Sequence, residues 1–273
     1  MHVWFNGSVL DDPRSAVIGV DDHGITVGDG VFETLKVVDG QPFALTRHLE
    51  RLVGSATGLG LPAPDLDAVR SGVAAVLSGL ELPLGRLRIT CTAGPAPFGS
   101  GRGAGPETVF VVADEMAGAP DTTAIVRVPW VRNERSAIAG LKTTSYAENV
   151  VALARAQESG ASEAIFANTV GNLCEGTGSN IGYVVDGEAR TPSLTSGCLA
   201  GVTRALLLEW CDVVEIDEPI SVLDQAEEVF LVSTTRDVQP VHRIDGRGLG
   251  APGPVTRAIR DTWAKRAAEN VDP

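Results

Sequence analysis

The chain has 273 residues, of which 44% are hydrophobic, 5% aromatic and 21% charged. This length suits two domains of moderate size, and the apolar content is enough for a buried core. The formal net charge is −13 at pH 7. A chain this acidic repels phosphate backbones and anionic lipid surfaces. We therefore expect neither a nucleic acid nor a membrane as a partner. The first residues lack the basic start and apolar stretch of a signal peptide, and no apolar run could span a bilayer, so we expect a cytoplasmic protein.

Short apolar runs between turn signals predict strands along the whole chain, with hairpin turns at Asn6-Gly7 and Asp39-Gly40. Runs with helical spacing predict helices, for which Thr46 and Asp65 are candidate N-caps. The segment 116–122 reads as a linker, so two α+β domains are predicted, at 1–117 and 120–273. The expected strands lie within 2–10, 31–45, 86–94, 108–116, 124–131, 162–168, 180–187 and 227–235, and the expected helices are one from 46, 65–79, 144–159, 201–210 and a polar helix around Lys265.

The common catalytic motifs are absent. There is no GxSxG, no HExxH and no Cys/His cluster with metal-ligand spacing, so no metal is expected. The glycine-rich stretch 176–182 is followed by a strand pattern and not by a helix, which excludes a dinucleotide-binding turn. Lysine is rare, however, with only Lys36, Lys142 and Lys265. Lys142 stands between an irregular stretch and a helix, where it is either a solvated charge or a partly desolvated amine able to form imines and to act as a base.

Six segments in a fixed order resemble the class IV aminotransferases, which have pyridoxal 5′-phosphate as cofactor and fold type IV. They are GDGVFETLKV (28–37), HLERL (48–52), GLKTTSYAENVVALA (140–154), CEGTGSNIG (174–182), LAGVTRALL (199–207) and VSTTRDVQPV (232–241). The group includes branched-chain aminotransferases, D-amino acid aminotransferases and 4-amino-4-deoxychorismate lyase. The resemblance implies a two-domain α+β enzyme with the cofactor in the interdomain cleft, and a homodimer in which a partner loop closes the substrate pocket.

The resemblance also implies a role for individual residues. Lys142 matches the Schiff-base lysine, which is the catalytic base and acid. Glu175 matches the carboxylate that pairs with the pyridine nitrogen, and Arg51 the arginine that grips the phosphate. Tyr146 either bonds the ring 3′-oxygen or packs as a helix tyrosine. The remaining positions that match phosphate contacts are Val202 and Thr203 at a helix start, Thr235 and, less clearly matched, Thr234.

The departures from the family pattern bear on the substrate. Phe32 stands where D-amino acid aminotransferases carry a tyrosine, and the loop 94–99 lacks their Arg-x-His carboxylate trap. Together with the compact length, these features resemble 4-amino-4-deoxychorismate lyase, which yields 4-aminobenzoate and pyruvate in folate biosynthesis. Arg88 and Arg102 are candidates for binding the substrate carboxylate, or else ordinary strand and loop charges. The alternatives are an aminotransferase for branched-chain L-amino acids or D-amino acids and, more remotely, a non-catalytic cofactor-binding homologue.

Overall fold

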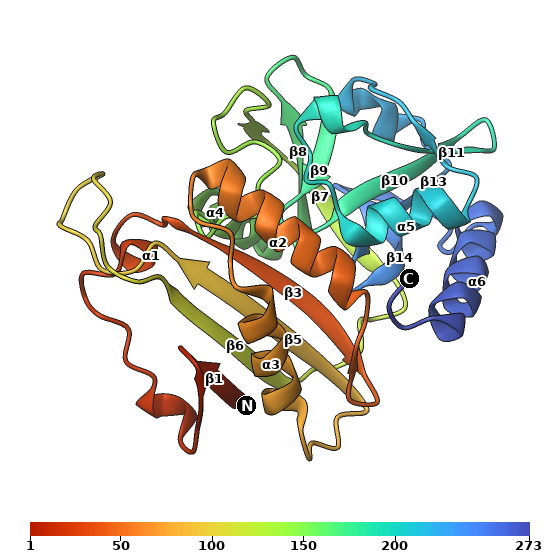
Figure 1. The fold of residues 1–273 in the computed structure, drawn as a ribbon. Coiled ribbons are helices and arrows are strands. Elements are labelled where there is room, and N and C mark those ends of the chain that lie inside the picture. The colour runs from red at the N-terminus through yellow and green to blue at the C-terminus, as the bar shows by residue number, and fades with distance from the viewer. The chain divides into compact units, whose positions relative to one another are not determined.

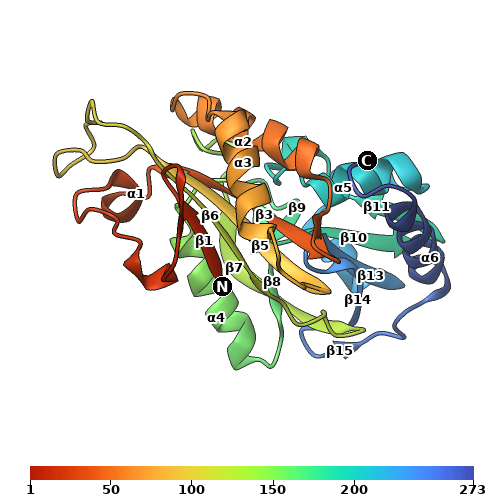
Figure 2. The ribbon, with the colours of Figure 1, turned by 60° about the horizontal axis from the view of Figure 1, so that its bottom comes forward.

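The computed structural model describes residues 1–273 and divides into two compact units. The first unit comprises Met1–Gly118, Leu141–Tyr146 and Val271–Pro273, and the second comprises Ala119–Gly140 and Ala147–Asn270. Each unit contains one β-sheet with helices packed on it (Figures 1 and 2). None of the helices combines the length and the apolar character needed to cross a membrane.

The first unit is built on a six-stranded antiparallel sheet in the order β2-β1-β6-β5-β3-β4. Its longest pairing joins β3 to β5 from Gly30↔Thr92 to Val38↔Leu84. The elements of this unit are β1 (His2–Phe5), β2 (Ser8–Leu10), α1 (His23–Thr26), β3 (Gly30–Val38), β4 (Gln41–Pro42), α2 (Leu45–Leu59), α3 (Leu66–Leu77), β5 (Leu84–Thr92) and β6 (Thr108–Glu115).

Helices α2 and α3 cover this sheet and close its core (Figure 1). Leu49, Leu52 and Ala56 recur on one side of α2, as the 3.6-residue period requires, and all three are buried. They pack in one cluster with Leu35 and Leu87 of the sheet. This packing fixes α2 along β3, and both elements carry predicted site residues.

The second unit is built on a nine-stranded mixed sheet, in which β12-β11-β10-β13-β14-β7-β8-β9 follow one path and β15 pairs with β14. The pairs β14–β7, β7–β8 and β11–β12 are parallel. Its elements are β7 (Thr123–Arg132), α4 (Ala147–Glu158), β8 (Glu163–Asn168), β9 (Leu173–Gly176), β10 (Asn180–Val185), β11 (Glu188–Thr191), α5 (Val202–Trp210), β12 (Val214–Glu215), β13 (Glu228–Ser233), β14 (Asp237–Ile244), β15 (Arg247–Gly248) and α6 (Pro254–Glu269).

Alternation along β7 separates two cores in this unit. Ile125 faces one cluster with Ile165 and Leu231, whereas Ala124 and Val126 face another with the alanines of α4. Helix α4 therefore covers β7 and β8, and α5 and α6 pack against β13 and β14 (Figure 2). A strand with two buried faces explains why its sequence is a nearly continuous apolar run.

The division of the chain differs from the prediction in one respect that matters for the site. The boundary between the units falls between Gly118 and Ala119. However, the segment Leu141–Tyr146 belongs to the first unit, whereas the prediction placed Lys142 in the domain 120–273. The reason is main-chain bonding: the Phe32 amide donates to the Lys142 carbonyl at 3.1 Å, and Thr143 forms a β-bridge with Val31. Sequence periodicity does not report such pairing between distant segments.

Candidate active site

Lys142 is held by main-chain bonds on a rigid part of the first unit. Its amide donates to the Oγ of Ser55 in α2 at 3.1 Å, and its carbonyl accepts from Phe32 in β3. Two buried elements therefore fix its backbone from two directions, so that its side chain extends from a defined point.

The amine of Lys142 lies against two aromatic rings. Its Nζ is 3.5 Å from the Tyr146 hydroxyl oxygen and 4.4 Å from the centroid of the Phe32 ring. The two rings meet edge to face, with centroids 5.1 Å apart and planes at 74°. Tyr146 precedes α4, so it is not the packed helix tyrosine of the alternative interpretation. A hydroxyl and a π-face next to the amine suit a lysine that exchanges protons in a partly apolar site.

Arg88 of β5 lies over the same Phe32 ring. Its Cζ is 3.8 Å from the ring centroid, and its Nε donates to Thr90 Oγ1 at 3.3 Å. Burial lowers the pKa of Arg88, and the nearby Tyr146 raises it to a smaller extent. No acidic side chain forms an ion pair with Arg88. A half-buried guanidinium without a counter-charge is well suited to bind a carboxylate ligand.

Arg102, the other predicted carboxylate ligand, holds a loop in place. Its Nε and Nη2 each donate to Asp29 at 2.7 Å, and further donors reach the carbonyls of Leu59 and Gly60 at the end of α2. The hydrogen bonds from Arg102 lower the pKa of Asp29, although burial opposes them. Arg102 thus ties the loop 94–107 to the end of α2, and Arg88 is the better candidate for the substrate carboxylate.

Arg51 belongs to a buried network with Glu33 and His48. Its Nε and Nη2 donate to the two oxygens of Glu33 at 2.8 and 2.7 Å, and His48 Nδ1 lies 2.7 Å from Glu33 Oε2. Burial alone raises the pKa of Glu33, but the charge and hydrogen bonds of Arg51, with the hydrogen bond of His48, lower it to about 2. Glu33 therefore stays ionised and orients the Arg51 guanidinium. Sequence reasoning assigned no role to Glu33 or His48, although both lie within the quoted segments 28–37 and 48–52.

In the second unit, both carboxylate oxygens of Glu175 of β9 accept hydrogen bonds. Arg132 Nε donates to Oε1 at 3.2 Å, and the amide of Leu199 donates to Oε2 at 3.0 Å. Arg132 also lies 4.2 Å from the Phe166 ring centroid and 3.6 Å from a Glu148 oxygen. Because each carboxylate oxygen has two lone pairs, the group can still accept a further hydrogen bond. Arg132 was not among the predicted site residues. Its only sequence signal was its position at the end of an apolar strand.

The start of α5 offers backbone donors. Its N-cap, Gly201, provides no side-chain cap, while Val202 and Thr203 are both buried. A Cβ at Gly201 would lie 2.1 Å from Asn180 Oδ1, so any larger residue would have to displace the Asn180 side chain. The helix is nine residues long, and its first amides and dipole favour an anion such as phosphate. Thr234 and Thr235 lie in the turn after β13 and are partly exposed.

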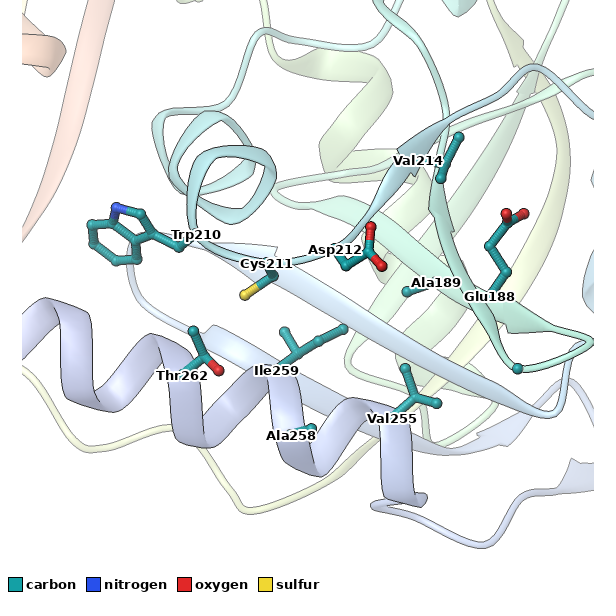
Figure 3. A pocket seen from close by; sticks show the side chains of 11 residues that line it. Glu188, Ala189, Trp210, Cys211, Asp212, Val214, Val255, Ala258, Ile259 and Thr262 are labelled. Carbon is teal, nitrogen blue, oxygen red and sulfur yellow. The ribbon is translucent and has the colours of Figure 1, made fainter.

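A cavity of about 340 Å³ lies at the other end of α5, next to β11 and α6 (Figure 3). None of its 11 lining residues is a predicted site residue. Cys211 is the one thiol in its lining, and burial raises the pKa of that thiol, so little thiolate forms at neutral pH. The cavity therefore carries no evident chemistry of its own.

The groups present fit pyridoxal phosphate in kind. They comprise an amine on a rigid segment, a carboxylate with acceptor capacity left over, and a helix start with no capping side chain. The amine suits the cofactor's aldehyde, the carboxylate suits its protonated pyridine nitrogen, and the helix start suits its phosphate dianion.

The comparisons with known proteins agree with this reading. The family model for amino-transferase class IV matches residues 30–244. A Methanocaldococcus jannaschii protein assigned as a branched-chain-amino-acid aminotransferase is 31% identical, with 96% of this chain and 95% of that one covered. D-alanine aminotransferase from Bacillus licheniformis is 32% identical, with 95% of both chains covered. A solved structure from Legionella pneumophila, assigned as a 4-amino-4-deoxychorismate lyase, is 25% identical, with 94% of this chain and 97% of that one covered and a TM-score of 0.87.

The matched region holds five of the six quoted segments in full, together with Arg51, Lys142 and Glu175. The relatives also match this chain from end to end, so the likeness covers both units. The chain therefore belongs to the class IV aminotransferases, a family of pyridoxal-phosphate-dependent enzymes of fold type IV.

Proposed function

We propose that this enzyme is a 4-amino-4-deoxychorismate lyase that releases 4-aminobenzoate and pyruvate in cytoplasmic folate biosynthesis. The observation that carries the proposal is the Arg88 guanidinium, which has no acidic ion-pair partner and lies over the Phe32 ring beside the Lys142 amine. The proposed substrate is a flat ring with carboxylates and an amine. It needs a cation, an apolar face and a base close together. In the proposed site Arg88 is the cation, Phe32 the apolar face and Lys142 the base.

Lys142, Arg51, Glu175, the start of α5 with Val202 and Thr203, and the Thr234–Thr235 turn are proposed to hold the cofactor. When bound, pyridoxal phosphate supplies an electron sink for the electron pair left at the amine-bearing carbon of the substrate. Arg88 pairs with a substrate carboxylate and orients the ring against Phe32. Tyr146 accepts a hydrogen bond from the Lys142 amine and keeps it in place.

The proposed reaction needs one base. Lys142 Nζ removes the proton from the amine-bearing ring carbon. The adjacent C–O bond then breaks, and the enolpyruvyl group leaves and gains a proton to become pyruvate. The ring becomes aromatic in this step, which drives the reaction forward.

A second candidate is an aminotransferase, because the two sequence relatives reported above bear that name at 31% and 32% identity. Lys142 would remove the same proton and would then act as an acid at a different position, so that no C–O bond of the substrate breaks. The absence of an Arg-x-His pair in the loop 94–99 and the engagement of Arg102 by Asp29 favour the lyase over a D-amino acid enzyme.

Product analysis distinguishes the candidates. Cofactor-loaded enzyme is supplied with 4-amino-4-deoxychorismate and no keto acid, with Lys142→Ala as the inactive control and Lys265→Ala as a matched lysine control. Release of 4-aminobenzoate and pyruvate over many turnovers is expected. No product there, with turnover of L-leucine or D-alanine once 2-oxoglutarate is added, would identify an aminotransferase instead.

A homodimer is part of the proposal. The first unit exposes large apolar side chains on the segment before β3 and on the loop after β5, namely Val17, Val20, Ile25 and Phe98. Contact with a second copy would remove them from water. Light scattering should give twice the mass of one chain, about 57 kDa from 28.4 kDa per copy.

A further inference from the structure

Helix α2 begins without a capping side chain of its own. Its N-cap is Ala44, which has a left-handed backbone (φ 54°) and makes no side-chain cap hydrogen bond. Thr46, the predicted N-cap, lies inside the first turn, since the helix begins at Leu45. The first amides of α2 therefore need partners from elsewhere in the chain.

Residues 271–273, here called the strap, supply these partners. Asp272 accepts hydrogen bonds from the Thr46 amide at 2.8 Å and from the Thr46 hydroxyl at 2.7 Å. The Val271 carbonyl accepts from the Ala44 amide at 2.7 Å, and the Pro273 carbonyl accepts from Arg47 Nε at 2.8 Å. A carboxylate 226 residues away along the chain thus caps α2 and lies at the positive end of its dipole.

The capped helix bears two groups of the candidate site. Ser55 Oγ accepts the amide hydrogen of Lys142 at 3.1 Å, and Arg51 binds both oxygens of Glu33 on β3. A helix that frays or shifts at its first turn changes the position of both groups, because they lie within the following three turns.

We infer that Asp272 is a positioning residue for the cofactor site: it fixes the start of α2 and, through Ser55 and Arg51, the segment that carries Lys142. The inference rests on the proposed roles of Lys142 and Arg51. It goes beyond them because it assigns a role in cofactor binding to a residue that touches none of the reacting groups.

The chain contains a matched control. Asp65 caps α3 in the same unit, where its Oδ1 accepts from the amides of Asp67 and Ala68 at 3.0 and 3.1 Å. Helix α3 carries no predicted site residue. Loss of this cap should therefore destabilise the same unit and leave the cofactor site unchanged.

The test compares Asp272→Ala, Asp272→Asn and Asp65→Ala in the full chain. The dissociation constant of pyridoxal phosphate is measured by absorbance titration at a temperature where all variants are folded. Amide hydrogen exchange over α2 is measured in parallel without cofactor. We expect Asp272→Ala to weaken cofactor binding about fivefold and to speed exchange in α2. Asparagine caps helices about as well as aspartate, so Asp272→Asn should restore most of the affinity.

Asp65→Ala should lower the melting temperature and leave the cofactor dissociation constant unchanged. Faster exchange in α2 with an unchanged constant in Asp272→Ala would overturn the inference while the cofactor roles of Lys142 and Arg51 stand. An equal loss of affinity in both alanine variants would reduce Asp272 to a general stabilising residue and would also overturn it. Wild-type protein that takes up no cofactor would contradict the proposed function, and this inference with it.

Discussion

Arg51 and Glu33 form a two-point ion pair in which Nε and Nη2 bond the two carboxylate oxygens at 2.8 and 2.7 Å. The Glu33 side chain is fully buried, and that of Arg51 is 15% exposed. A buried carboxylate without a cation is costly, so the pair is needed for the fold as well as for the orientation of Arg51. The same contact thus joins the stability of the first unit to its candidate site.

Glu33→Gln should destabilise the protein strongly. The substitution keeps the shape of the side chain but leaves the largely buried Arg51 guanidinium without its carboxylate, for an expected loss of about 3 kcal/mol. Urea denaturation measures the change. Glu158→Gln is the control, because its pair with Arg155 lies in solvent and should contribute less than about 1 kcal/mol. Equal losses of unfolding free energy in the two variants would contradict the proposed importance of the buried pair.

Stability should fall in two steps on acidification. Burial lowers the pKa of His48 below its ordinary 6.5, and Glu33 has a pKa of about 2 against an ordinary 4.5. Below pH 6.5, and again below pH 4.5, the unfolded chain binds a proton that the folded chain does not, so the free energy of unfolding decreases with falling pH. Urea midpoints between pH 7.5 and 3 test this. His48→Gln should flatten the upper step only, and a wild-type midpoint that stays constant down to pH 4 would contradict the prediction.

Arg88→Gln should impair substrate binding more than turnover. Loss of the guanidinium removes the proposed partner of the substrate carboxylate, and we expect KM to rise at least about tenfold with a smaller change in kcat. Arg86→Gln is a matched control, since Arg86 lies two residues away on the same strand and is exposed. Steady-state kinetics on the substrate identified by product analysis provide the test. A KM of Arg88→Gln unchanged from wild type would contradict the proposed role of Arg88 in substrate binding.

Much of the fold could be predicted from local patterns. The hairpins at 2–10 and 31–45, the cap at Asp65 and the helix at 201–210 are all found, because alternation, turn residues and capping are local signals. The helix expected over 144–159 begins later, at Ala147, because residues 141–146 bond to the first unit. The prediction of Thr46 as an N-cap was wrong because the capping carboxylate comes from Asp272, far along the sequence.

The candidate site was predictable only where a segment resembled the family. Lys142, Arg51 and Glu175 lie in the quoted segments, but no sequence pattern identifies the residues that hold them in place. Glu33 holds Arg51, Arg132 binds Glu175, and Ser55 binds the main chain of Lys142. Each of these contacts joins positions at least 18 residues apart, and a single sequence carries no signal for such pairs.

Arg132→Gln should weaken cofactor retention through Glu175. Arg132 supplies the positive charge next to this carboxylate, whose side chain is 13% exposed, and the substitution removes that charge together with one hydrogen bond. A less firmly held carboxylate is a poorer partner for a protonated pyridine nitrogen, so the cofactor dissociation constant should rise about tenfold. Absorbance titration measures it, and Arg132→Lys, which keeps the charge, should retain part of the affinity. Arg155→Gln is the surface control and should bind the cofactor as the wild type does. If Arg132→Gln also binds the cofactor as the wild type does, Glu175 does not depend on Arg132 for its part in cofactor binding.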